Sequence, residues 1–117
     1  MDKVTIYHNP GCSRSRGALE ILVERGVPHD VVEYLETPPS EETLASFVAM
    51  LPDPPAELVR KDKRFAELGL DPADYTKPEQ VVAILRKHPE LMQRPVVVRG
   101  RRAVIARPSE KVREILD

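Results

Sequence analysis

A β-α-β pattern in the first 35 residues constrains the fold of this chain more than any other feature. Lys3–His8 has the alternating, β-branched character of a short strand, and apolar residues then recur at helical spacing over residues 12–25. Gly26 predicts the end of that helix, and a second strand follows over about 29–35. Two strands joined by one helical crossover pair in parallel, with a right-handed connection. The pattern predicts an α/β fold.

The turn between the first strand and the first helix holds the only cysteine, Cys12, directly after Pro10-Gly11. A thiol in the first turn of a helix faces unpaired backbone N–H groups and the positive end of the helix dipole, and both favour the thiolate. A lone cysteine is most often an inert buried side chain, but the turn and the neighbouring Arg14 and Arg16 indicate a position near the surface. We interpret Cys12 as a nucleophile. One cysteine excludes an internal disulfide and a zinc site of several thiolates, so we expect no metal.

The remaining segments predict helices and one hairpin. Residues 36–90 read as an all-helical insertion, in which Ser40 is an N-cap and Thr76–Glu79 a capping box. Residues 94–98 and 102–106 predict an antiparallel hairpin, and Ser109 is the expected N-cap of a closing helix. We therefore expect one domain over 1–117, with a small mixed β-sheet, flanking helices and the insertion.

Composition excludes several classes of function. The formal net charge of the 117 residues is −1, and the chain has no Trp, three Tyr and two Phe. Such a chain offers neither a strong field for nucleic acid nor many rings for stacking bases, so we expect no nucleic-acid partner. It has no apolar run of membrane-spanning length and no signal-peptide pattern at its start, so we expect no membrane association and a cytoplasmic protein.

Six segments together resemble the family of glutaredoxin-dependent arsenate reductases. In order along the chain they are His8–Arg16, Tyr34–Ser40, Leu58–Lys61, His88-Pro89, Arg94–Val98 and Arg107–Glu110. The resemblance covers essentially the whole chain. It implies a thioredoxin-like fold, in keeping with the predicted order of strands and helices.

The resemblance also assigns site residues. It implies that Cys12 attacks arsenate, that Arg60, Arg94 and Arg107 hold the oxyanion, and that His8 supports the thiolate. Arginine suits this role because its planar fork can hold two oxygens at once. Arg94 precedes a strand and Arg107 precedes a helix, so both lie at element ends, where side chains can converge. For His8, a histidine simply hydrogen-bonded at a strand end is an equal alternative. The other basic residues, Arg64 among them, are expected to be surface charges.

Ser15 stands where dithiol enzymes of this fold place their second cysteine. A second thiol must then come from solution, and the resemblance implies glutathione as co-substrate and glutaredoxin as partner. We expect no bound cofactor and a monomer. One alternative is a monothiol glutathione-dependent reductase of another substrate. The other is a redox-responsive regulator that binds RNA polymerase. Such regulators typically carry C-x-x-C, so Ser15 argues against this second alternative.

Pro95 resembles the cis-proline of thioredoxin folds, although trans is the default for an X-Pro bond.

Overall fold

The structure is a computed structural model that describes residues 3–116. The chain divides into two compact units. The first contains the N-terminal residues up to Thr37 and the C-terminal residues from Arg94 onward, and the second is Pro38–Gln93. The second unit has nearly the bounds expected for the insertion. The expectation of one domain for the whole chain stays a prediction.

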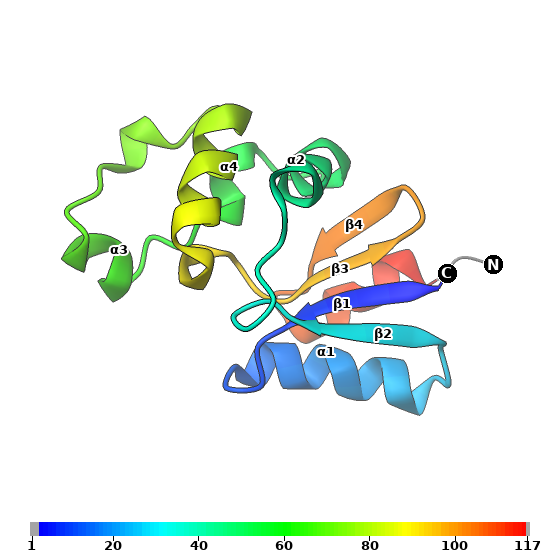
Figure 1. The fold of residues 1–117 in the computed structure, drawn as a ribbon. Helices are drawn as coiled ribbons and strands as arrows, with labels where there is room; N and C mark the ends of the chain where they lie inside the picture. The colour runs from blue at the N-terminus through cyan, green and yellow to red at the C-terminus, as the bar shows by residue number, and fades with distance from the viewer. Residues whose placement is uncertain (1–2, 117) are drawn as a thin grey trace. The chain divides into compact units, whose positions relative to one another are not determined.

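The first unit is built on a four-stranded mixed sheet with the order β2-β1-β3-β4 (Figure 1). β1 (Val4–His8) pairs in parallel with β2 (His29–Glu33), and α1 (Ser13–Glu24) connects them. β1 also pairs antiparallel with β3 (Val96–Arg99), which forms a hairpin with β4 (Arg102–Ile105). The β-α-β unit, the hairpin and the predicted fold class are thus confirmed.

The core of the first unit lies between the sheet and the two helices that follow β1 and β4. Residues of β1 alternate between buried and partly buried, as expected for a strand with one covered face. One buried cluster joins β1, α1, β3, β4 and η4 (Ser109–Ile115); its members are Val4, Ile6, Ala18, Ile21, Leu22, Val97, Val104, Ala106, Val112 and Ile115. His8 alternates in phase with Val4 and Ile6, so its side chain faces α1 from the end of β1.

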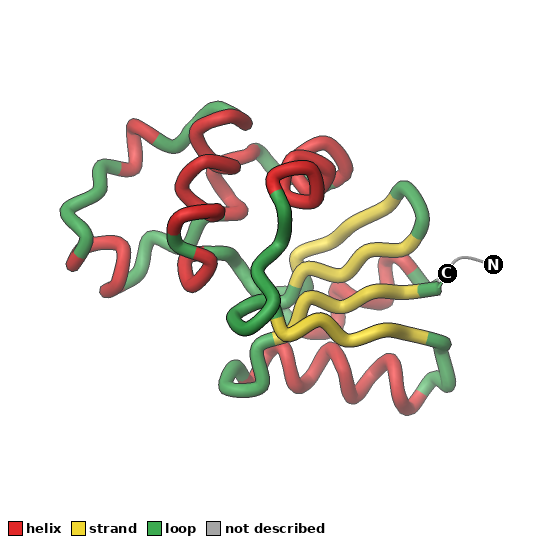
Figure 2. Tube along the Cα trace, in the orientation of Figure 1, coloured by secondary structure: helices red, strands yellow, loops and turns green. Residues whose placement is uncertain are grey.

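The second unit is helical. Its α-helices are α2 (Glu41–Met50), α3 (Lys63–Glu67) and α4 (Pro78–Lys87), and its short 3₁₀ segments are η1 (Pro55–Leu58), η2 (Pro72–Asp74) and η3 (Pro89–Leu91). Figure 2 shows helix and loop along this part of the trace. Among its described residues the β-structure is a single bridge between Val59 and Met92. This agrees with the predicted helical insertion.

Two predicted caps are wrong and one is confirmed. The hydroxyl of Ser40 accepts the backbone N–H of Thr43 and caps α2 as expected. At α4 the N-cap is Lys77, not Thr76, and the side chain of Gln80 accepts both their backbone N–H groups. The last helix is 3₁₀ with Pro108 as its N-cap, because the hydroxyl of Ser109 donates instead to a carbonyl of α1.

Several strand ends also differ from prediction by one or two residues. β2 ends at Glu33, because residues 34–36 form a turn, and β3 begins at Val96 rather than Arg94. The Arg94–Pro95 bond is cis, as is Arg107–Pro108. Within residues 3–116, no helix is long and apolar enough to cross a membrane.

Candidate functional site

Cys12 is the N-cap residue of α1 and a free, partly buried thiol. Its backbone N–H donates to Asn9 O at 3.0 Å, which closes the Pro10-Gly11 turn and fixes Cys12 at the N-terminus of α1. From this position the side chain points at the backbone N–H groups of the first helical turn, the place where a side chain normally caps. The strand, the turn and the helix therefore set the sulfur where the sequence predicted it.

The surroundings of Cys12 favour its thiolate. Burial by itself raises the pKa of Cys12, but hydrogen bonds from the backbone N–H groups of Ser15 and Arg14, together with the Arg94 guanidinium, leave that pKa below its ordinary value. These donors are fixed by the helix and by the sheet, so they are in place before any substrate arrives. The sequence predicted that a helix start would favour the thiolate of Cys12. In the structure, the backbone N–H groups of that helix and the Arg94 guanidinium have this effect.

Arg94 reaches the sulfur from the segment that leads into β3. Its side chain donates a hydrogen bond to Cys12, while its Nε atom is buried with no hydrogen-bond partner among residues 3–116. A buried guanidinium N–H without a partner is costly, so this donor is available to a bound acceptor. Arg94 therefore combines a contact to the nucleophile with unused capacity for an oxyanion.

Arg107 lies beside Arg94. Its Nη1 donates to the backbone carbonyl of Arg94 at 3.3 Å, and the backbone N–H of Ala106 donates to Pro95 O at 3.0 Å. These two bonds join the residues just before β3 to the residues just after β4. The structure thus brings three of the predicted site residues together: Cys12 with Arg94, and Arg94 with Arg107.

His8 contacts Ser15 rather than the sulfur. Its Nδ1 lies 2.6 Å from Ser15 Oγ, and the same hydroxyl accepts the backbone N–H of Asn9 at 3.0 Å. Burial lowers the pKa of His8, and Arg16 lowers it further, against the opposing effect of Glu33 on β2. This is the alternative arrangement, a histidine hydrogen-bonded at the end of a strand. A direct role for His8 at the thiolate stays a prediction.

The sequence did not predict the hydrogen bonds that Ser15 makes at this site. Ser15 is fully buried in α1, and it links the end of β1 to the helix while its own N–H faces Cys12. The sequence showed it only as the place of a missing second cysteine. A serine inside the first turn of a helix, seven residues after a strand-end histidine, was the available signal.

Arg60 belongs to the second unit, directly after η1. Its backbone N–H donates to Leu91 O at 2.7 Å, and Gln93 N–H donates to Leu58 O at 2.8 Å, so residues 58–60 are held against residues 91–93. Its guanidinium forms an ion pair with Asp62 at 3.0 Å. That Arg60 meets the same oxyanion as Arg94 and Arg107 stays a prediction.

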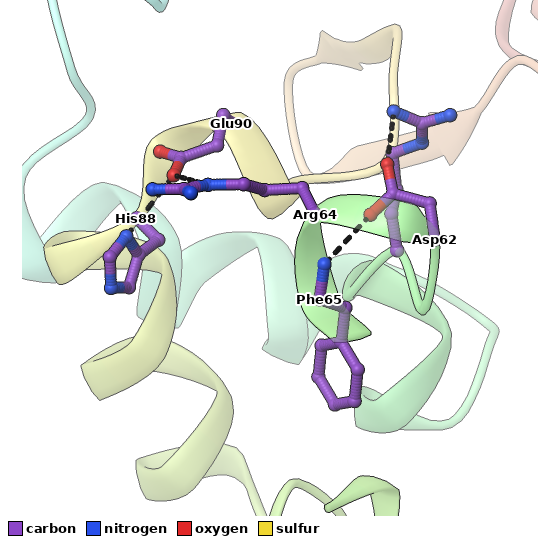
Figure 3. Close-up of polar contacts among 6 residues, drawn as sticks. Asp62, Arg64, Phe65, His88 and Glu90 are labelled. Atoms are coloured by element: carbon purple, nitrogen blue, oxygen red, sulfur yellow. Dashed lines mark hydrogen bonds and ion pairs between the residues drawn. The ribbon is translucent and has the colours of Figure 1, made fainter. Parts of the chain in front are cut away.

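A second polar cluster joins α3 to η3 in this unit (Figure 3). Glu90 Oε2 lies 3.1 Å from Arg64 Nε and 3.1 Å from His88 Nδ1. Burial raises the pKa of Glu90, but its own backbone N–H, Arg64 and His88 bring that pKa below its ordinary value. Arg64 is an exposed charge, as predicted, and it tethers α3 to the segment that follows α4.

Comparison with known proteins places the chain in a family. The sequence profile of the ArsC family matches residues 7–115, a range that includes every site residue named above. The chain belongs to the ArsC family. It is 39% identical to an arsenate reductase of Escherichia coli over 99% of this chain and 82% of that protein. It is 42% identical to the uncharacterized protein YfgD of Escherichia coli strain K12, over 97% of each chain.

A solved structure that is similar over nearly the whole chain has the same fold. The structure titled arsenate reductase from Vibrio cholerae superimposes with a TM-score of 0.86 at 37% identity, and covers 97% of this chain and 98% of its own. The thioredoxin-like fold and the resemblance seen in the sequence are thereby confirmed. Among residues 3–116 of this ArsC-family chain, no three His, Cys, Asp or Glu side chains gather as metal ligands would.

Proposed function

We propose that this protein is an oxidoreductase that reduces arsenate to arsenite, with Cys12 as its nucleophile. The observation that carries the proposal is geometric: Cys12 is the N-cap residue of α1 and lies beside Arg94, whose buried Nε atom has no hydrogen-bond partner among residues 3–116. Relatives similar to this chain over nearly its whole length are named arsenate reductases, which supports the choice of substrate.

The first step uses the residues that the structure brings together. The Cys12 thiolate attacks the arsenic atom, a sulfur–arsenic bond forms, and one arsenate oxygen leaves as water after protonation. Arg94 and Arg107 bind the remaining oxygens, and the family resemblance implies the same role for Arg60. Positive donors fixed in advance stabilise the charge that builds up on those oxygens as the bond forms.

The reduction then needs thiols from solution, because the sequence has one cysteine. We propose that glutathione adds to the arsenic with loss of a second water. A thiolate of glutaredoxin next attacks the glutathione sulfur; the sulfur–arsenic bond breaks, and its electron pair reduces arsenic from the +5 to the +3 state. Hydrolysis of the bond to Cys12 releases arsenite and returns the thiol.

One assay tests this proposal. Arsenite is measured during incubation with arsenate, glutathione and glutaredoxin, and again with each omitted, with Cys12→Ser as the control. We expect sustained arsenite production in the complete mixture and none in the control. Absence of arsenite, together with activity on another glutathione-linked substrate, would instead identify a monothiol reductase of that substrate.

A further inference from the structure

Asp62 uses its two carboxylate oxygens for two different contacts. Oδ2 lies 3.0 Å from Nη1 of Arg60, and Oδ1 accepts the backbone N–H of Phe65 at 3.2 Å, which caps α3 (Figure 3). The Arg60 and Asp62 side chains are 22% and 31% exposed, so water screens their interaction only in part. The carboxylate of Asp62 therefore lies against the guanidinium proposed to bind the substrate.

Other contacts of the second unit hold both Arg60 and Asp62 in place. Phe65, which α3 carries into the core of the second unit, is buried and stacks edge-to-face on Tyr75 with ring centroids 5.8 Å apart. Arg64, in the same helix, is bound to Glu90, and the backbone of Arg60 is bound to Leu91. The carboxylate of Asp62 is thus kept at a fixed place instead of moving away when an anion approaches.

We propose that Asp62 is a built-in counter-charge that weakens the binding of oxyanions to Arg60. The inference rests on the proposed role of Arg60. A bound oxyanion and the Asp62 carboxylate share one guanidinium, so their negative charges repel each other at short range. The repulsion grows with the charge of the ligand, so a doubly charged oxyanion is weakened more than a singly charged one. Asp62 would keep the site from retaining dianions tightly between turnovers.

The test compares variants that keep the cap of α3 but remove the charge. Asn and Ser cap helices about as well as Asp does, so Asp62→Asn and Asp62→Ser should both preserve α3. Calorimetry with sulfate should show binding roughly two- to fivefold tighter in both variants, the range expected for a partly exposed ion pair. With perchlorate, a tetrahedral monoanion, the gain should be smaller.

Two controls separate this effect from general changes in charge or stability. Asp71 caps η2 by accepting the N–H of Ala73, and it forms no ion pair within residues 3–116, so Asp71→Asn should leave sulfate affinity unchanged. In an Arg60→Ala background, Asp62→Asn should no longer tighten sulfate binding, because the shared guanidinium is gone.

The possible outcomes separate this inference from the proposed function. If Asp62→Asn binds sulfate more tightly in a way that depends on Arg60, but the protein does not reduce arsenate, the role proposed for Asp62 stands and the proposed reductase activity is wrong. Arsenate reduction with unchanged or weaker sulfate binding in Asp62→Asn would reject the counter-charge and retain the reductase. The inference would also be overturned if Asp62→Asn tightened the binding of sulfate and perchlorate equally, or if neither the parent protein nor Asp62→Asn bound sulfate.

Discussion

The hydroxyl of Ser109 donates a hydrogen bond to the backbone carbonyl of Arg14 at 2.7 Å, across 95 residues of sequence. This contact fixes the start of η4, just after Arg107, to the first turn of α1, just after Cys12. The approach is close enough that a Cβ atom added at Gly17 would lie 2.5 Å from Ser109 Oγ and 3.1 Å from Ser109 Cβ. The glycine at position 17 is thus required by the packing of η4 on α1.

Gly17→Ala should therefore destabilise the protein, against the usual trend for a glycine inside a helix. Overpacking at this contact should lower the free energy of unfolding by roughly 1 to 3 kcal/mol. Elsewhere, Gly→Ala within a helix stabilises by about 1 kcal/mol. Urea denaturation measures the change, and adding Ser109→Ala should recover part of the loss. A Gly17→Ala protein more stable than the parent would show that this contact is described wrongly.

Alkylation of Cys12 should depend on pH with a shifted midpoint. Because the pKa of Cys12 is lowered, the reactive thiolate forms at a lower pH than in an ordinary thiol and is lost as the pH falls through that lowered pKa. The rate of reaction with iodoacetamide, followed from pH 5 to 9, should have its midpoint below the ordinary thiol value of about 8.5. Arg94→Ala should move the midpoint up, and Arg101→Ala, on the exposed hairpin turn, should not. A midpoint at or above the ordinary value would refute the activation of Cys12.

The three arginines should contribute to catalysis far more than a surface arginine does. Replacing Arg60, Arg94 or Arg107 with Ala should reduce kcat/KM by the equivalent of about 2 to 4 kcal/mol, as the loss of one fixed donor does at other sites that stabilise an oxyanion. Lysine at these positions should restore part of the activity, because it keeps the charge but not the fork. Arg101→Ala is the matched control. Similar small losses at all four positions would reject the assignment.

Local patterns in the sequence predicted most of the fold. Strand alternation, the Gly26 helix end and the Ser40 cap depend on neighbours within a few residues, and each is present in the structure. The cap assigned to Ser109 failed because its hydroxyl bonds to Arg14, a partner that no local pattern reveals. The cap of α4 moved by one residue because Gln80 accepts the N–H of Lys77 as well as that of Thr76.

The candidate site was predictable to a different degree at each residue. Cys12 followed from the strand, turn and helix around it, because a helix start provides donors wherever it occurs. Arg94 and Arg107 came from the resemblance, since their meeting depends on the hairpin that joins β3 to β4. The pairing of His8 with Ser15 was missed because it crosses the turn from β1 to α1. Asp62 was also missed, although an aspartate at N-cap spacing before α3 and two residues from Arg60 was a usable signal.

The most direct test of the whole account is the intact mass of the protein during turnover. With arsenate and glutathione present and glutaredoxin absent, a covalent adduct of glutathionyl-arsenic or glutathione should accumulate on Cys12, and Cys12→Ser should carry none. Glutaredoxin should clear the adduct while arsenite appears, because one cysteine cannot supply both electrons through an internal disulfide. Repeated production of arsenite with no external thiol, or turnover by the Cys12→Ser protein, would contradict the account.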